Sequence, residues 1–221
     1  MIKGILWDVG GTILYPNYRT ETDYLKTILI KYGVNIEALS LSDFINMINK
    51  MRNNYFNVNT LEDEEKNYRM IFKTYFPKIK NEMLENIIDE IMIGYDQFCI
   101  PNEIKQLIKD LKKLELEQVV ISNWPPSLSK MLQAHGLSDY FDYILSSGIL
   151  GIKKPNLKIF EFALDKMNLD ASEVIMIGNS YDFDINPAKS INIKTIKFSV
   201  KKDSISKLKT DIFQLLEENN V

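Results

Sequence analysis

The chain opens with Ile2-Lys-Gly-Ile-Leu-Trp-Asp-Val-Gly-Gly-Thr-Ile-Leu14, an apolar run that reaches a carboxylate, Asp8, and then two consecutive glycines. Such a run is typical of a strand that is buried on both faces, as strands of parallel sheets are. Open parallel sheets bind their ligands at the C-terminal ends of the strands, which is where Asp8 would lie. Asp and Gly are also common turn formers, so the segment alone is equally compatible with an Asp8 that only caps a turn. The rest of the sequence has to separate these two interpretations.

The composition is that of an ordinary soluble globular protein, with 45% hydrophobic and 26% charged residues in 221. This length is sufficient for one large core, or for a core and a smaller insert. The formal net charge of −3 offers no basic surface to a nucleic-acid backbone, so we expect no nucleic-acid partner. A single Cys and a single His exclude an intramolecular disulfide, a cysteine-based zinc site and a histidine metal site.

The sequence shows no N-terminal signal and no apolar run of transmembrane length. We therefore expect a cytoplasmic protein that does not contact a membrane. The oligomeric state is not indicated by any pattern in the chain.

Four helical patterns follow the first strand, and no convincing strand lies between them. They cover residues 20–32, a segment from Ser40 or Ser42 through Met51, residues 62–76, and residues 81 to about 95. Their Tyr, Phe and Met residues recur at helical spacing, which is typical of a packed core rather than of a cofactor site. An insert of about eighty residues is too long for a loop, so the segment 16–96 is predicted to be a small all-helical domain.

Strands and helices alternate after Pro101. Strands are predicted at 118–123, 143–146, 174–177 and 193–200. One helix is predicted to begin at residue 102, a second to end at residue 135, a third to include residues 160–164, and a fourth to span residues 205–218. This alternation predicts an α/β fold, a Rossmann-type parallel sheet flanked by helices. Residues 1–15 and 97–221 would form this core domain, with the helical domain inserted between them.

Polar side chains stand at the ends of three predicted strands. They are Asp8, then Ser122 with Asn123, then the turn from Asn179 to Asp184, while Lys154 lies on a connecting loop. Strands of one parallel sheet point their C-terminal ends at the same edge, so these groups can converge. A carboxylate nucleophile, a hydroxyl, an amide, a cation and further acids suit the transfer of an anionic group through a covalent aspartyl intermediate.

With these motifs in this order, the chain resembles the haloacid dehalogenase (HAD) superfamily of hydrolases, which use an aspartate nucleophile. The family's four motifs are matched, in order, by Asp8-Val-Gly-Gly-Thr-Ile13, Ile121-Ser-Asn123, Lys154-Pro155, and Ile177-Gly-Asn-Ser180 with Asp184. The helical insert lies where this family carries its C1 cap domain. Most members are magnesium-dependent phosphatases, so the resemblance implies a phosphohydrolase that acts on a small phosphorylated molecule.

The resemblance also implies roles for individual residues. Asp8 would attack phosphorus and form an aspartyl phosphate, and Lys154 would neutralise charge on the nucleophile and the phosphate. Residues that would bind substrate or brace the first loop are Ser122, Asn123, Lys154 and Thr12. Mg²⁺ would be held by Asp8, the main-chain carbonyl of Gly10, Asn179 and Asp184, with Asp182 close by.

Two positions depart from the family pattern. Gly10 stands where the typical phosphatase has a second Asp that acts as general acid and base, a role worth roughly 10²–10⁴-fold in rate. Asn179 stands where most relatives have a metal-binding Asp, so one negative charge is missing from the metal site. The expected consequence is weak metal binding and an enzyme that is slow or restricted in its substrates.

Other functions stay open on the sequence. A protein that has lost catalysis and binds a ligand or partner is one alternative, although it would gain little from keeping both Asp8 and Lys154. Dehalogenation needs neither metal nor the missing acid, but dehalogenating members have a Tyr where this chain has Phe160, and Arg19 lies too near Asp8 to match their halide-binding Arg. A phosphonate-cleaving enzyme would need a reactive Lys in the cap, where Lys26, Lys31 and Lys50 are unremarkable candidates.

Overall fold

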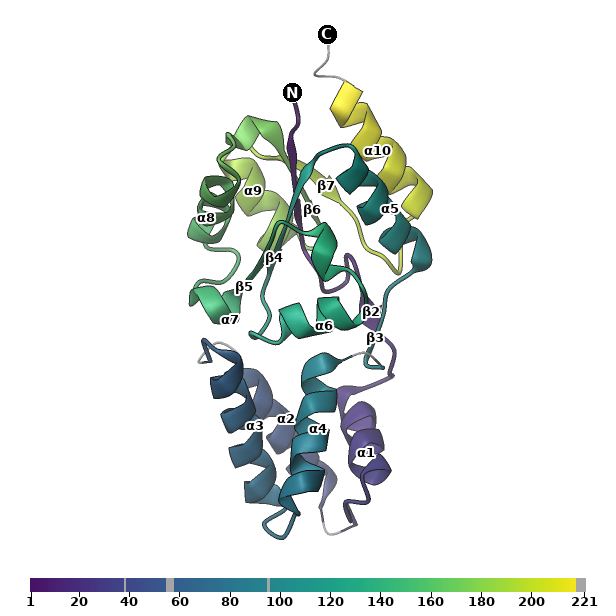
Figure 1. The fold of residues 1–221 in the computed structure, drawn as a ribbon, viewed down its shortest axis with the longest axis vertical. Coiled ribbons are helices and arrows are strands. Elements are labelled where there is room, and N and C mark those ends of the chain that lie inside the picture. Colours follow the sequence, from purple (N-terminus) through teal and green to yellow (C-terminus); the bar gives the residue numbers. More distant parts are fainter. Residues whose placement is uncertain (38, 55–57, 95, 218–221) are drawn as a thin grey trace.

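The computed structural model describes residues 1–37, 39–54, 58–94 and 96–217, and its centre is a five-stranded parallel sheet (Figure 1). The strand order is β5-β4-β1-β6-β7. The strands are β1 (Gly4–Trp7), β4 (Glu117–Ser122), β5 (Tyr143–Ser146), β6 (Val174–Gly178) and β7 (Lys194–Lys197). The first strand is therefore the central one, with β4 on one side and β6 on the other, in agreement with its unbroken apolar run.

Helices cover both faces of the sheet. Successive side chains of β1 point to opposite faces, so Ile5 and Trp7 belong to one apolar cluster and Leu6 to another. The first cluster includes side chains of α5 (Asn102–Lys113), α6 (Leu128–Ala134) and α10 (Ile205–Glu217). The second includes side chains of α8 (Leu157–Met167) and α9 (Asn186–Ser190), while the short α7 (Ser147–Leu150) follows β5. This is the predicted α/β architecture.

The four inserted helices have an apolar core of their own. They are α1 (Glu21–Lys31), α2 (Leu41–Asn54), α3 (Leu61–Tyr75) and α4 (Asn81–Ile93), and their buried side chains form a third cluster, separate from the two at the sheet. Thr20 and Thr60 cap α1 and α3 by accepting hydrogen bonds from main-chain N–H groups of the first turn. The predicted helices are thus confirmed, and many of their apolar side chains form a packed core.

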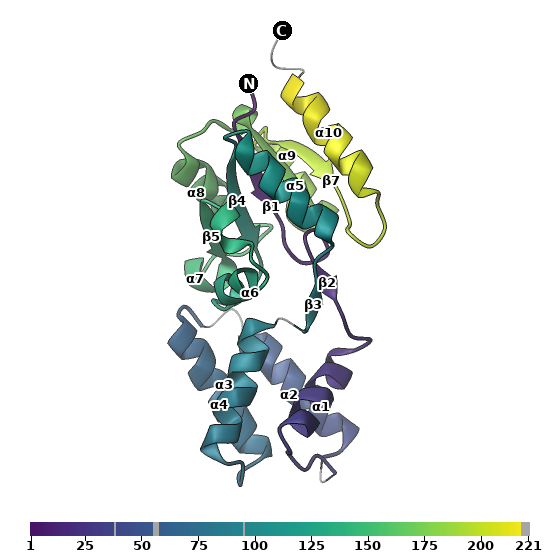
Figure 2. The ribbon, with the colours of Figure 1, turned by 45° about the vertical axis from the view of Figure 1, so that its right-hand side comes forward.

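A two-stranded antiparallel ribbon links the helical segment to the α/β part, and no sequence pattern predicted it. It pairs β2 (Tyr15–Pro16) with β3 (Phe98–Cys99), so both connections between the two parts run side by side (Figure 2). The last strand is shorter than the predicted 193–200, because the structure limits it to Lys194–Lys197. The predicted helix ends at residues 95 and 218 lie outside the described residues.

The helical segment also touches the α/β part through a buried carboxylate. Glu64, near the start of α3, is 1% exposed, and its two carboxylate oxygens accept hydrogen bonds from the main-chain N–H and the hydroxyl group of Ser127, at 2.8 and 2.7 Å. Lys130 and Glu65 form a more exposed ion pair beside this contact, at 3.3 Å. Burial raises the pKa of Glu64, and the hydrogen bonds from Ser127 offset part of that rise.

We expect Glu64→Ala to lower the free energy of unfolding by about 1–3 kcal/mol, because the buried N–H of Ser127 loses its acceptor. Urea denaturation measures this, and Glu65→Ala should change stability by less than about 1 kcal/mol. The raised pKa adds a pH signature. Folding favours the protonated form of Glu64, so the stability of the unmodified protein relative to Glu64→Gln should decrease as pH rises from about 4.5 through the raised pKa of Glu64. A difference that is constant with pH would mean that Glu64 ionises equally easily in the folded and unfolded protein.

Candidate active site

The polar ends of the strands meet at one edge of the sheet. Asp8 follows β1, Ser122 ends β4, and Asp184 lies on a short helical turn after β6, Tyr181–Ile185. Together with Lys154 they line a cavity of about 190 Å³. The complete lining is Asp8, Gly10, Ser122, Asn123, Trp124, Lys154, Asn179, Ser180, Phe183 and Asp184. The sequence predicted this convergence, and the structure places the groups within one small space.

Lys154 is the centre of the charge arrangement. Its Nζ atom lies 2.8 Å from Asp8 Oδ1 and 2.6 Å from Asp184 Oδ1, and its side chain is only 2% exposed. Burial alone would lower the pKa of Lys154, but the two carboxylates outweigh this effect and raise it above its ordinary value. Burial and the nearby Asp8 raise the pKa of Asp184, and Lys154 partly offsets the rise. The amine is therefore held as a cation between two acids.

Two side chains that were predicted to bind substrate have other contacts. Thr12 is fully buried, and its hydroxyl group donates to Asp8 Oδ2 at 2.9 Å, so it orients the carboxylate. The side-chain amide of Asn123 bonds the main chain of Lys154 in both directions, accepting from its N–H at 2.8 Å and donating to its carbonyl at 2.9 Å. Thr12 therefore braces Asp8, and Asn123 fixes the loop that carries Lys154, while direct contact of either side chain with substrate stays a prediction.

Gly10 and Gly11, which follow Val9, differ in whether the structure can accommodate a side chain at their positions. Gly11 has a φ of +83°, and a Cβ atom there would lie 2.2 Å from the side chain of Asn179, so only glycine fits. Gly10 lies outside the left-handed region, and a Cβ atom there would meet only the ring of Trp124, at an ordinary 3.6 Å. The backbone therefore accommodates a side chain at position 10.

The cavity contains donors that suit magnesium. Asp8, Asp184 and Asn179 line it together with Gly10, and carboxylate, amide and carbonyl oxygens are the ligands that hard divalent cations prefer. Asp182, the neighbouring acid noted in the sequence, is exposed and does not line the cavity. Among the described residues there is no cluster of three or more His, Cys, Asp or Glu side chains, so a metal would rely on the amide and the carbonyl as well. These oxygen donors fit Mg²⁺, but only Asp8 and Asp184 among them carry a negative charge.

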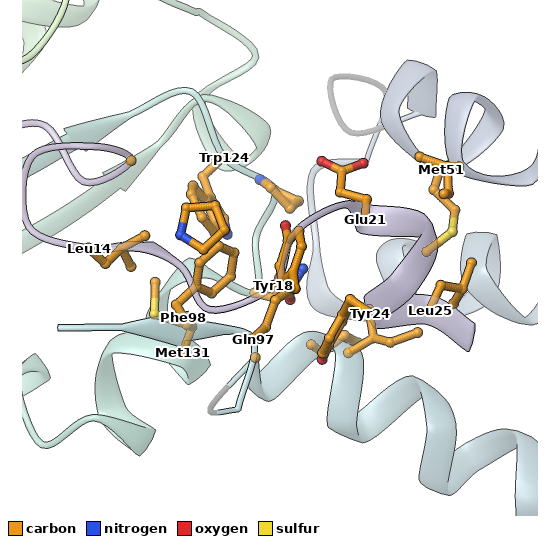
Figure 3. A pocket seen from close by; sticks show the side chains of 18 of the residues that line it. Leu14, Tyr18, Glu21, Tyr24, Leu25, Met51, Gln97, Phe98, Trp124 and Met131 are labelled. Carbon is orange, nitrogen blue, oxygen red and sulfur yellow. The ribbon is translucent and has the colours of Figure 1, made fainter. Parts of the chain in front are cut away.

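A second cavity of about 350 Å³ adjoins the first. Gly10, Asn123 and Trp124 line both, and the rest of the larger lining comes mainly from the helical segment and the ribbon. Figure 3 shows Trp124 and Phe98 at one end, Leu25 and Met51 at the other, and Tyr18 with Glu21 between them. Sequence reasoning did not assign these residues to the site. The only signal was the position of Trp124 directly after Ser122 and Asn123, at the end of a predicted strand.

The sequence matches the family model of haloacid dehalogenase-like hydrolases over residues 2–192, so the chain belongs to this family of enzymes. It is 27% identical over 211 residues to a glyceraldehyde 3-phosphate phosphatase of Methanocaldococcus jannaschii, covering 89% of this chain and 85% of that protein. Both the predicted family and the assignment of the protein as a hydrolase are thereby confirmed.

Solved structures show the same fold at lower sequence identity. A 2-haloacid dehalogenase from Pseudomonas syringae pv. tomato superposes with a TM-score of 0.71 at 16% identity, covering 97% of this chain and 99% of that one. An enzyme of this family from Bacteroides thetaiotaomicron, crystallised with magnesium and inorganic phosphate, gives 0.64 at 18% identity, covering 92% and 97%. These likenesses confirm the predicted fold. Among the described residues, no helix has the length and apolar character needed to cross a membrane.

Proposed function

We propose that the protein is a magnesium-assisted phosphohydrolase that acts on small phosphate monoesters through an aspartyl phosphate on Asp8. The observation that carries the proposal is the buried cation of Lys154, held at 2.8 Å from Asp8 and 2.6 Å from Asp184 at the end of the central strand. Lys154 cancels one of the two carboxylate charges, and Mg²⁺ bound at the same carboxylates would make the site net positive, so that it could hold an anionic group and stabilise the charge that develops on it. The relative named as a glyceraldehyde 3-phosphate phosphatase supports the same class of reaction.

In the first step an Asp8 carboxylate oxygen attacks phosphorus, the bond from phosphorus to the ester oxygen breaks, and that oxygen leaves with the electron pair. Thr12 and Lys154 each hold one oxygen of Asp8, which fixes the plane of the carboxylate for an in-line approach. In the second step water attacks the aspartyl phosphate, which releases inorganic phosphate and restores Asp8. Ser122, which lines the cavity and is 2% exposed, would donate a hydrogen bond to a phosphoryl oxygen.

Mg²⁺ held by Asp8, the Gly10 carbonyl, Asn179 and Asp184 would neutralise phosphoryl charge and orient the group. The chain supports this donor set by fixing Asp184 from two sides. Lys154 bonds its Oδ1 atom, and the main-chain N–H of Ser180 donates to its Oδ2 atom at 2.9 Å.

The helical segment 16–96 is proposed as a cap domain over the core domain 1–15 and 97–221. Its separate apolar core, its connection through the β2–β3 ribbon, and its share of the larger cavity support this division. The cap would then supply most of the contacts to the organic part of the substrate, which is how it would select among phosphate esters.

Phosphate release from a panel of phosphate monoesters, with and without Mg²⁺, tests the proposed function. We expect Mg²⁺-dependent release that Asp8→Asn abolishes. Halide release from 2-haloacids without metal, in place of phosphate release, would identify a dehalogenase. Binding of esters with no turnover of either kind would identify a binding protein.

We expect Mg²⁺ to bind weakly, and Asn179→Asp to tighten the binding by about tenfold or more through one added charge. The Mg²⁺ concentration that gives half-maximal activity, together with direct calorimetric titration, measures the change. The matched control is Asp182→Asn, which removes an exposed charge three residues further along the same turn and should leave the affinity unchanged. Equal affinity in the Asn179→Asp and unmodified proteins would show that residue 179 is not a ligand.

A further inference from the structure

The larger cavity is placed to receive the organic part of a substrate whose phosphate lies at Asp8. It shares Gly10, Asn123 and Trp124 with the phosphate-sized cavity, so the two cavities are neighbours and the organic part of an ester bound at Asp8 would lie close to the larger one. Its volume of about 350 Å³ lies near the lower limit for small-molecule sites, which suits a single ring better than a large ligand.

Four aromatic rings stand in sequence along this cavity. Trp124 contacts Phe98 edge to face at 5.2 Å between ring centroids, Phe98 lies 6.5 Å from Tyr18, and Tyr18 stacks on Tyr24 at 5.3 Å. The series begins at the residue that borders the phosphate cavity and runs into α1 (Figure 3). At these spacings the rings pack on one another, and because all four line the cavity they also present aromatic surface to it. A flat apolar ligand would gain free energy from that surface beyond simple burial.

The charges of the lining disfavour an anionic organic part. The carboxylate of Glu21 is already paired with Arg52, at 2.8 Å, and the described lining residues include no Lys or Arg. A second phosphate or a carboxylate on the substrate would therefore find no cation in the lining itself. The hydroxyl group of Tyr24 is buried and has no hydrogen-bond partner among the described residues, and burial keeps its pKa well above the ordinary value. It stays protonated as an unused donor beside the cavity.

The glycine at position 10 also favours a phenolic leaving group. With no acid at this position, the departing oxygen leaves as an anion, and a phenol with a pKa of about 10 bears that charge far better than an aliphatic alcohol. This argument concerns bond breaking and is independent of the aromatic lining, which concerns binding.

We propose that the substrate is a phosphate monoester of a phenolic hydroxyl on a single uncharged aromatic ring. The ring lies against the cavity wall that Trp124, Phe98 and Tyr18 form, while the phosphate lies at Asp8. The bond from Asp8 to phosphorus forms as the aryl oxygen–phosphorus bond breaks, the phenolate takes the electron pair, and water then supplies its proton. The proposal rests on the proposed phosphohydrolase function and narrows its substrate class.

Three esters separate binding from bond breaking. Phenyl phosphate has the ring and a good leaving group, benzyl phosphate has the ring and an alcohol leaving group, and glycerol 3-phosphate has neither. We expect KM for both ring esters to be at least about tenfold below that for glycerol 3-phosphate, the equivalent of one aromatic contact. We expect kcat/KM, which reports the bond-breaking step, to be about 10²-fold or more higher for phenyl phosphate than for benzyl phosphate.

Tyr18→Leu retains apolar bulk and removes a ring, so it should lower kcat/KM for phenyl phosphate relative to glycerol 3-phosphate by about five- to tenfold. The control Tyr143→Leu removes a partly exposed ring on β5, outside the cavity, and should not change that ratio. Binding of phenyl phosphate to Asp8→Asn, followed by calorimetry, gives a readout that needs no turnover and should weaken in the Tyr18→Leu background.

Failure of the substrate class and failure of the function give different results. Hydrolysis of glycerol 3-phosphate with a KM equal to or below that of the ring esters would overturn the aromatic substrate and leave the phosphohydrolase intact. An absence of phosphate release from all three esters, acetyl phosphate and glyceraldehyde 3-phosphate would overturn the function itself, and the substrate class with it.

Discussion

Asp8→Asn is expected to reduce phosphate release by about 10⁴-fold or more, the scale of loss when other hydrolases lose an essential catalytic group. An amide has no anionic oxygen with which to attack phosphorus, so no aspartyl phosphate forms. The effect should appear entirely in turnover, because the amide keeps the shape of the side chain and Lys154 keeps Asp184 as a partner at 2.6 Å. Steady-state rates and acid-quench detection of phosphoprotein both measure it.

Two controls distinguish this loss of catalysis from a loss of folding. Urea denaturation should show that the Asp8→Asn protein still unfolds cooperatively, and Asp182→Asn, which removes an exposed carboxylate nearby, should keep full activity. Retention of more than about a tenth of the activity in Asp8→Asn would mean that the nucleophile is another group, and the proposed mechanism would be wrong.

Gly10→Asp is expected to accelerate the hydrolysis of alkyl phosphates by about 10²–10⁴-fold, the range that general acid catalysis supplies. Esters of phenols should gain much less, since their leaving groups need no proton. The structure accommodates an Asp side chain at position 10, because the φ of Gly10 lies outside the left-handed region and a Cβ atom there meets only Trp124, at 3.6 Å. The rates of a series of esters, plotted against leaving-group pKa, measure the effect.

The matched control for this variant is Gly10→Asn, which has the same shape and cannot donate a proton as an acid. It should leave the steep dependence on leaving-group pKa unchanged, whereas Gly10→Asp should flatten it. A dependence that is already flat in the unmodified protein, with chemistry shown to be rate-limiting, would mean that another residue supplies the proton. The unmodified protein should also accumulate the aspartyl phosphate and give a burst of leaving group, because the second step lacks its usual base.

The parts of the site that the sequence predicted are those that depend on strand ends. Asp8, Ser122 and Asp184 each follow an apolar run, and the geometry of a parallel sheet brings such positions to one edge whatever the details of packing. Lys154 could be added only through the family motif, since no periodic pattern places a loop residue. The missing acid at position 10 is evident from the sequence alone, because Gly10 occupies its place in the family motif.

The parts that the sequence could not predict depend on contacts between distant segments. The Glu64–Ser127 contact joins residues 63 positions apart, and neither residue has a local pattern that distinguishes it from a helix surface or a turn. The pairing of Asn123 with the main chain of Lys154 depends on the path of a loop, and propensities do not determine that path. Tyr18 lies in a stretch that the sequence predicts to be a loop, and Phe98 belongs to no predicted motif. The structure places Phe98 between Tyr18 and Trp124, in contact with both rings.

The central position of β1 influences which part of the protein unfolds first. Because β1 is hydrogen-bonded to β4 on one side and β6 on the other, its amide groups become exposed to exchange only when the sheet itself opens. The four inserted helices have their own core and meet the rest mainly through the ribbon and the Glu64–Ser127 contact, so we expect them to open at a lower free energy. If these helices form the proposed cap, mild heat or denaturant would remove selectivity among esters before it disturbs the positions of Asp8 and Lys154.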